Sequence, residues 1–417
     1  MTGKSTLCVV SPWNYPLFNP ENQTHFGGWE VRLALITKEL ARRGRFKVRM
    51  VVADHGQPHC ELRDGVTLYS WIGREIWGVP LPEKQPDLPE TKVSWWREAM
   101  QWLRQPFVKR HDFPPLRSGQ VGSYMIETQL LSIYDEVDAD IYLVPGNSQF
   151  SGEMAFYCQQ RGKKYVFLAG SDIDFRPEYK IEPEKFDLYG VLHGLKAYAI
   201  DNAHLHLAQN EHQANLLRQG YNRTACIVRN PIELARVFPR AASARTLLWI
   251  GKSDERVKRP SMILELARRL PEYPFVVIMN MGIAETHTHC IQEAKKLSNV
   301  TLINRVPFHE VEQYFAQAKL HINTSTFEGF PNTFLQAAKY GVPTLAAKVD
   351  PGTMLSQHGC GACCADDLEV LVNTIREFMT DAALYAGTSA NCVEYVRAYH
   401  NKETIIPQYE KALSTLL

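Results

Sequence analysis

The segment FEGFPNTFLQAAKYGVP, residues 327–343, places a carboxylate, Glu328, five residues after the apolar run LHIN at 320–323. Gly329 and Pro331 predict a tight turn, and Asn332 or Thr333 then begins a helical pattern. In open parallel sheets, ligands bind beyond the carboxyl ends of the strands, where the N–H groups of a helix start can bind an anion. An acceptor carboxylate beside such a helix end predicts a ligand with hydroxyls and phosphates, as in a nucleotide sugar. The alternative is an ordinary solvated glutamate.

A second loop, IGKSDERVKRP at 250–260, directly follows the apolar run TLLWI at 246–250. Gly251 permits a close approach of the backbone, and Lys252 and Lys258 can reach the same crevice. Two cations near a helix start suit a diphosphate. A solvated basic loop is the alternative, but the neighbouring Glu328 turn favours contact with phosphate.

Apolar runs alternate with helical patterns along the rest of the chain, which predicts α/β domains with parallel sheets covered on both faces. Strands are expected at 7–10, 48–53, 141–144, 165–169, 204–208, 246–250, 275–279, 300–303 and 320–323. Two such series predict two doubly wound, Rossmann-like domains. We expect the first at 1–235, the second at 236–395, and a C-terminal helix at 396–417 that packs back towards the first domain.

A segment at about 75–120 interrupts the pattern with prolines, tryptophans and basic residues. Its part KVSWWREAMQWLRQPFVKR, residues 92–110, places several tryptophans beside arginines and lysines. A helix packed on the first domain is the favoured interpretation. Peripheral contact with a membrane or a greasy acceptor is the alternative.

Composition excludes several classes of protein. A net charge of +1 in 417 residues argues against a nucleic-acid partner. We find no signal peptide and no apolar stretch long enough to span a membrane, which predicts a cytoplasmic protein, with membrane association as the open alternative. The cluster Cys360, Cys363 and Cys364 is interpreted as core residues rather than a metal site.

The opening motif resembles the E-x7-E phrase of glycosyltransferase family 4, whose members are retaining enzymes of the GT-B fold. Four further segments extend the resemblance over nearly the whole chain: HFGGWEVRLALITKELARRG (25–44), GKKYVFLAGSDIDF (162–175), AQNEHQANLLRQGYNRTACIVRNPIE (208–233) and LLWIGKSDERVKRPSMILELARRLPEYPFVVI (247–278). The resemblance implies a GT-B fold, with its two domains facing each other across a cleft.

The resemblance assigns roles in the second domain. Glu328 corresponds to the motif acid that holds donor-sugar hydroxyls, and Lys252 and Lys258 correspond to the pair that neutralises the leaving diphosphate. The backbone near the sugar and phosphates corresponds to Gly329, Phe330, Asn332 and Thr333, and base contacts correspond to residues around Asn304 to Pro307.

In the first domain, Gly27 and Gly28 correspond to the loop that closes over the diphosphate. Asp172, with Ser171 beside it, corresponds to the polar position that faces the reacting sugar. One position departs from the family pattern: the second motif acid is replaced by Gln336. Its amide oxygen can still accept a ribose hydrogen bond, but without the strength of a charged acceptor.

The resemblance implies retaining, metal-independent transfer of a sugar to an acceptor hydroxyl by a hexosyltransferase-type enzyme, with no cofactor beyond the donor. We expect a UDP- or GDP-linked donor in preference to an ADP-linked one, and a glycan, lipid-linked or small-molecule acceptor. Two alternatives stay open, a nucleotide-sugar epimerase on the same fold and a non-catalytic nucleotide-sugar-binding protein.

Overall fold

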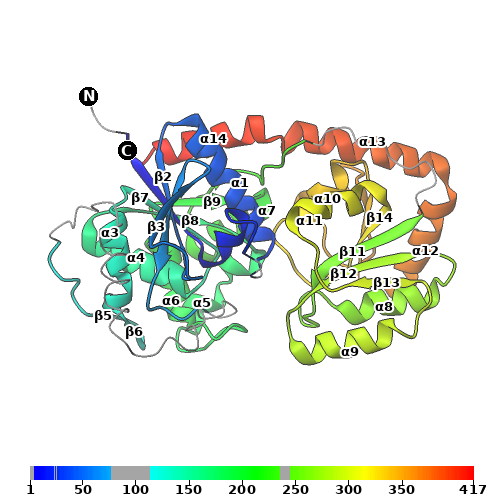
Figure 1. Ribbon diagram of the computed structural model, residues 1–417, viewed down its shortest axis with the longest axis horizontal. Helices are drawn as coiled ribbons and strands as arrows, with labels where there is room; N and C mark the ends of the chain where they lie inside the picture. The colour runs from blue at the N-terminus through cyan, green and yellow to red at the C-terminus, as the bar shows by residue number, and fades with distance from the viewer. Residues whose placement is uncertain (1–3, 23, 25, 77–112, 235–244) are drawn as a thin grey trace, which may run out of the picture. The chain divides into compact units, whose positions relative to one another are not determined.

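The computed structural model describes residues 4–22, 24, 26–76, 113–234 and 245–417, which form two compact units (Figure 1). Unit 1 comprises Met1–Ala208, Gln213–Val228 and Ile406–Leu417, and unit 2 comprises Gln209–His212 and Arg229–Ile405. The Trp-rich segment at 92–110 lies outside the described residues. The domain divisions expected after residues 235 and 395 stay predictions.

Unit 1 is built around an eight-stranded sheet of order β10-β9-β8-β7-β1-β2-β4-β3. Its strands are β1 (Thr6–Val10), β2 (Lys47–Ala53), β3 (Cys60–Arg63), β4 (Val66–Trp71), β7 (Ile141–Pro145), β8 (Lys164–Leu168), β9 (Leu205–Ala208) and β10 (Cys226–Ile227). All neighbouring strands are parallel except β3, which pairs antiparallel with β4 at the edge. The expected parallel sheet is therefore present, whereas its strands β3, β4 and β10 were not predicted.

Helices cover both faces of this sheet. They are α1 (Gly28–Arg43), α3 (Ser132–Val137), α4 (Gln149–Arg161), α5 (Glu178–Ile181), α6 (His193–Asp201) and α7 (Glu211–Tyr221). The described part of the unit also contains the 3-10 turns η1 (Pro12–Leu17), η2 (Thr128–Leu131) and η3 (Asp172–Phe175), and a hairpin of β5 (Gly119–Val121) and β6 (Tyr124–Ile126). The helix α1 ends at Gly44, whose φ of 72° is the left-handed value that glycine adopts at helix ends.

Unit 2 contains a fully parallel six-stranded sheet of order β13-β12-β11-β14-β15-β16. Its strands are β11 (Thr246–Lys252), β12 (Phe275–Asn280), β13 (Val300–Ile303), β14 (Ala318–Asn323), β15 (Thr344–Ala346) and β16 (Gly361–Cys363). The predicted strands at 246–250, 275–279, 300–303 and 320–323 are all confirmed.

Helices again cover both faces, with α8 and α9 on one and α10 and α11 on the other (Figure 1). The helices of unit 2 are α8 (Pro260–Arg269), α9 (Ala284–Ala294), α10 (Phe308–Gln317), α11 (Asn332–Ala338), α12 (Leu368–Thr380) and α13 (Ala382–Tyr399), with a 3-10 turn, η4 (Pro351–Thr353). The side chains of α8, α9 and α12 form one core with the sheet, and those of α10 and α11 form a second core with it. No helix in the described parts of the chain is both long and apolar enough to cross a membrane.

The last helix, α14 (Lys402–Ser414), begins in unit 2 and ends in unit 1. In unit 1, Tyr409 is fully buried, and its hydroxyl accepts a hydrogen bond of 3.1 Å from Nη2 of Arg32 on α1. Arg32 is also buried and reaches the Ala169 carbonyl oxygen over 3.4 Å. A buried guanidinium needs such partners, because an unpaired buried charge is strongly unfavourable.

We expect Tyr409→Phe to lower the free energy of unfolding by about 1.5–3 kcal/mol, because the buried Arg32 loses a hydrogen bond. Urea unfolding monitored by tryptophan fluorescence measures the change. Tyr399→Phe on α13, where the side chain is partly exposed, serves as the control and should change stability by less than about 0.5 kcal/mol. Equal effects of the two variants would contradict the role given to Tyr409.

Candidate active site

In unit 2, the order in which successive strands are added to the sheet reverses between β11 and β14. From β11 the chain passes through β12 to β13 on one side, and β14 then pairs with β11 on the other. In open α/β sheets such a switch point, at the carboxyl ends of the strands, is where ligands bind. Lys252 ends β11, and the loops after β11 and β14 carry Lys258 and Glu328, so the sheet order brings the predicted residues to this point.

The end of β11 is shaped by the side chain of Trp249. A Cβ atom on Gly251 would lie 2.6 Å from the indole, so only glycine leaves room for the ring along the strand. The Trp249 Nε1 then donates a hydrogen bond of 2.8 Å to Oγ1 of Thr324. The absence of a side chain at Gly251 therefore leaves space for the indole of Trp249. Lys252 is the last residue of β11, and its side chain is exposed.

The hydroxyl of Thr324 joins the two loops. It accepts from Trp249 and donates to the carbonyl oxygen of Lys258 over 2.5 Å, and Arg259 Nε donates to the Thr324 carbonyl oxygen over 2.5 Å. The backbone N–H of Thr326 also donates to the Val257 carbonyl oxygen over 2.9 Å. These bonds hold the β11 loop and the β14 loop as one structure.

Glu328 and Lys258 meet where the two loops join. The Lys258 ammonium forms an ion pair with Oε1 of Glu328, and the Ser325 hydroxyl donates to the same oxygen over 2.7 Å. Ser325 is itself held by Asn323, whose Oδ1 accepts from its backbone N–H over 3.1 Å. Glu328 is therefore part of an ordered network of side chains.

His321, a buried histidine on β14, is neutral at neutral pH. Burial, together with the nearby charge of Lys258, lowers the pKa of His321 on β14 to about 3. Its Nδ1 lies 3.1 Å from Oγ1 of Thr344. At neutral pH His321 therefore adds no second positive charge near Lys258.

The helix α11 begins at Asn332, as the sequence predicted. Phe334, Leu335, Ala337 and Ala338 are buried, whereas Asn332, Thr333 and Gln336 are only partly buried. Residues three and four positions apart are neighbours on a helix, so Gln336 shares a face with both Asn332 and Thr333. The structure thus places Gln336 one turn beyond Asn332 on α11.

Asn230 and His400 support the turn before α11, and the sequence reasoning missed both. Asn230 Nδ2 donates to the carbonyl oxygen of Phe330 over 2.9 Å, and His400 Nδ1 donates to that of Asn230 over 2.8 Å. Burial lowers the pKa of His400 to about 3, so its ring stays neutral and packs 4.8 Å from the ring of Phe330. The Asn-Pro pair at 230–231 was the only local signal of a special turn.

In unit 1 the equivalent switch point lies at β1, between β7 and β2. Gly27 caps α1, and its N–H donates to Oε2 of Glu30 over 2.6 Å. Gly28, the first residue of α1, is exposed. The indole of Trp29 lies so close to Gly170, beyond β8, that a Cβ there would fall 1.3 Å from a ring carbon. Trp29 thus fixes the glycine loop against the loop that carries Asp172.

Asp172 begins η3, and its Oδ1 accepts a hydrogen bond of 3.2 Å from Nε2 of Gln213. The buried acid of this turn is Asp174, which the sequence reasoning did not select. Its carboxylate accepts from the N–H groups of Gly170, Ser171 and Asn147 at 2.7, 3.0 and 3.1 Å. Asp174 therefore shapes the turn, whereas the partly exposed Asp172 is the acid accessible at its surface.

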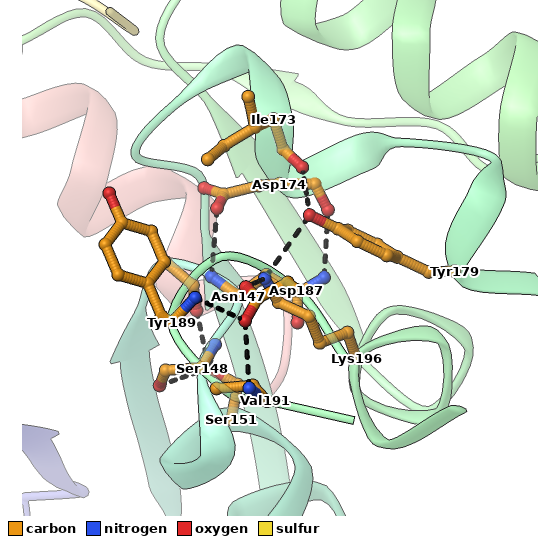
Figure 2. A network of polar contacts seen from close by, with 11 residues as sticks. Asn147, Ser148, Ser151, Ile173, Asp174, Tyr179, Asp187, Tyr189, Val191 and Lys196 are labelled. Carbon is orange, nitrogen blue, oxygen red and sulfur yellow. Dashed lines mark hydrogen bonds and ion pairs between the residues drawn. The ribbon is translucent and has the colours of Figure 1, made fainter. Parts of the chain in front are cut away.

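A chain of polar groups extends from this turn into the unit (Figure 2). The Tyr179 hydroxyl donates to the Ile173 carbonyl oxygen over 2.7 Å and accepts from Lys196 Nζ over 3.3 Å. Lys196 also pairs with Asp187 over 2.5 Å. Burial raises the pKa of Asp174, although its N–H donors and the charge of Lys196 offset part of that rise.

The titratable side chains give no sign of a metal centre in the part of the chain that the structure describes. Within the described ranges, no group of three or more histidine, cysteine or acidic side chains is placed to hold a metal ion. Cys360 and Cys364 are buried, and Cys363 is partly buried. Cys360 and Cys364 pack within hydrophobic clusters of unit 2, as the core interpretation expects.

Residues 244–381 match the family model described as Glycosyl transferases group 1. The match spans β11 to β16 and both loops of the site. No curated protein sequence gives a significant match.

Solved structures align with almost the whole chain. A sucrose-phosphate synthase from Thermosynechococcus elongatus gives a TM-score of 0.72 at 15% identity and covers 99% of each chain. HepE from Anabaena, in complex with UDP and glucose, gives 0.64 at 16%, covering 98% of this chain and 99% of that one. A TarM variant from S. aureus, in complex with fondaparinux, alpha-GlcNAc-glycerol and UDP, gives 0.67 at 10%, with the same coverage.

The chain therefore has the GT-B fold, with two Rossmann-like domains, as the sequence predicted. The family match over unit 2 and this fold together support a glycosyltransferase. The roles of the individual site residues stay predictions.

We expect Gly170→Ala to destabilise unit 1 by about 1–3 kcal/mol or more, because the new methyl group would overlap the Trp29 indole. Chemical denaturation provides the measurement. Gly387→Ala on α13 is the matched control, since nothing lies within 4 Å of its added Cβ; it should stabilise by about 0.5–1 kcal/mol. Adding Trp29→Ala to Gly170→Ala should recover part of the loss, and an additive result would rule out the overlap.

Proposed function

We propose that the protein is a retaining, metal-independent glycosyltransferase of family 4 that transfers a hexose from a nucleotide-sugar donor to an acceptor hydroxyl. The observation that carries the proposal is the meeting of Glu328 and Lys258 at the β11/β14 switch point. A carboxylate for sugar hydroxyls and an ammonium for phosphate lie side by side, as a sugar bound to a diphosphate requires.

The chemistry follows from charge development. Breaking the sugar–phosphate bond leaves negative charge on the diphosphate and positive charge at the anomeric carbon. Fixed cations that face the leaving group lower the barrier, and each tenfold in rate requires about 1.4 kcal/mol. In the proposal, Lys252 and Lys258 neutralise the diphosphate, and Glu328 accepts hydroxyls of the sugar and supports the positive charge.

The remaining roles follow the resemblance. The backbone of Gly329, Phe330, Asn332 and Thr333 contacts sugar and phosphates, and Gln336 accepts from the ribose. In unit 1, Gly27 and Gly28 contact the diphosphate, and Asp172 contacts the reacting sugar.

A UDP- or GDP-linked sugar is the proposed donor, with a glycan, lipid-linked compound or small molecule as acceptor. The structures of HepE and TarM, which contain UDP, support a nucleotide donor. We further propose that the protein acts in the cytoplasm in the synthesis of a polysaccharide or glycoconjugate.

Thermal shift with UDP, GDP and ADP tests the proposal first. A ligand at 100 times its dissociation constant should stabilise the protein by about 2.7 kcal/mol. The sugar forms of the ligand that binds are then incubated with EDTA, with and without candidate acceptors. Transfer with retained anomeric configuration supports the proposal, whereas an epimerised sugar, or binding without transfer or hydrolysis, would contradict it.

We expect Lys252→Ala and Lys258→Ala to weaken binding of the nucleoside diphosphate about tenfold or more, and that of the nucleoside much less. The reason is that a charge-assisted hydrogen bond contributes about 1.5–3 kcal/mol. Calorimetry measures the affinity of each variant for the nucleoside diphosphate and for the nucleoside. Lys296→Ala, in which an exposed lysine after α9 is removed, is the control and should leave both affinities unchanged. Equal losses for diphosphate and nucleoside would show that the lysines act elsewhere.

Gln336 yields a separate expectation. If its amide faces the ribose, Gln336→Glu preserves or strengthens donor binding. Gln336→Leu weakens binding by about 1–3 kcal/mol, because a ribose hydroxyl loses its acceptor. Gln317→Leu at the exposed end of α10 controls for the added apolar side chain. Donor affinity that is unchanged in Gln336→Leu would show that Gln336 is only a helix residue.

A further inference from the structure

Lys258 and Glu328 are assigned to different parts of the donor, yet here they bind each other. The ammonium pairs with Oε1 of Glu328, to which the Ser325 hydroxyl also donates over 2.7 Å. Among the described residues, no other side-chain hydrogen bond or ion pair of either group is seen. In this arrangement the cation needed for phosphate is already occupied by the acid needed for sugar.

The pair lies at the edge of the buried region. The exposed fractions of the side chains are 28% for Lys258 and 15% for Glu328. An ion pair that reaches water is accessible to a ligand, and its members can separate when the ligand gives each of them a new partner. Replacing the pair with a diphosphate on one side and sugar hydroxyls on the other leaves neither charge without a partner.

We propose that Glu328 competes with the diphosphate for Lys258, and that this competition promotes release of the product. The inference rests on the proposed function. While the intact donor is bound, sugar hydroxyls donate to Glu328 and Lys258 turns to the phosphates. After transfer the nucleoside diphosphate carries no sugar, so Glu328 regains Lys258 and the product loses a cationic contact.

The difference between donor and product follows from their contacts. A ligand shifts an equilibrium only by its differential interaction with the two states. The donor interacts with both members of the separated pair, whereas the product interacts with Lys258 alone. The ion pair therefore weakens binding of the product more than binding of the donor.

The test measures the dissociation constant of whichever of UDP, GDP and ADP binds the parent protein. Calorimetry compares the parent, Glu328→Gln, Lys258→Met and the double variant, each checked by its melting temperature. We expect Glu328→Gln to bind the diphosphate about two- to fivefold more tightly, and Lys258→Met to bind it more weakly. In the Lys258→Met background, Glu328→Gln should have no effect, because a coupled pair gives a non-additive cycle.

Two results would overturn the inference. If Glu328→Gln binds the diphosphate no more tightly than the parent does, then Glu328 does not compete with the diphosphate for Lys258. A gain of the same size in the Lys258→Met background would mean that the carboxylate simply repels phosphate. Glu328→Ala provides a second variant, with the same expected direction, if Glu328→Gln does not fold.

Asp366→Asn is the matched control. Asp366 pairs with Arg259, the residue after Lys258, over 2.5 Å, so the variant removes a negative charge from the same loop region. Its φ of 66° is a left-handed value that asparagine tolerates. We expect no change in affinity, and a gain equal to that of Glu328→Gln would overturn the inference. A parent that binds none of the three diphosphates would instead refute the proposed function itself.

Discussion

The hydroxyl of Thr324 is the contact on which the candidate site of unit 2 depends. It accepts from the Trp249 indole and donates to the Lys258 carbonyl oxygen, so one buried group joins two strands and two loops. A hydroxyl can do both at once, whereas an apolar side chain of the same shape would leave an indole N–H and a carbonyl unpaired. Through this contact Lys258 is held within reach of Glu328, although 70 residues separate them in sequence.

In unit 1 the loops at the carboxyl ends of the strands are also held together, but by a carboxylate and an indole instead of a hydroxyl. There a carboxylate, Asp174, collects N–H groups from the loops after β7 and β8, and the Trp29 indole packs on Gly170. The contacts of Thr324 in unit 2 and of Asp174 and Trp29 in unit 1 all lie at the carboxyl ends of parallel strands, where backbone groups are no longer paired within the sheet. Buried polar groups at such ends need partners, and these partners also order the loops.

Much of this could be predicted from the sequence. Continuous apolar runs identified the parallel strands because strands buried on both faces cannot alternate with polar residues. Pro331 and Asn332 located the start of α11 for a local reason, since turn residues and helix starts depend on near neighbours. The short antiparallel strand β3 escaped notice because edge strands are brief and only partly buried. Thr324, Asn230 and His400 also escaped it, because their partners come from distant segments that no local pattern reveals.

Residues 406–417 belong to unit 1, yet they are synthesised after all of unit 2. The hydrogen bond between Arg32 and Tyr409 spans 377 positions. During translation, this hydrogen bond of Arg32 therefore cannot form until the last turns of α14 emerge. Contacts this distant slow folding, since a long loop must close before they form. All strands of unit 2 are therefore synthesised before unit 1 gains its last helical turns.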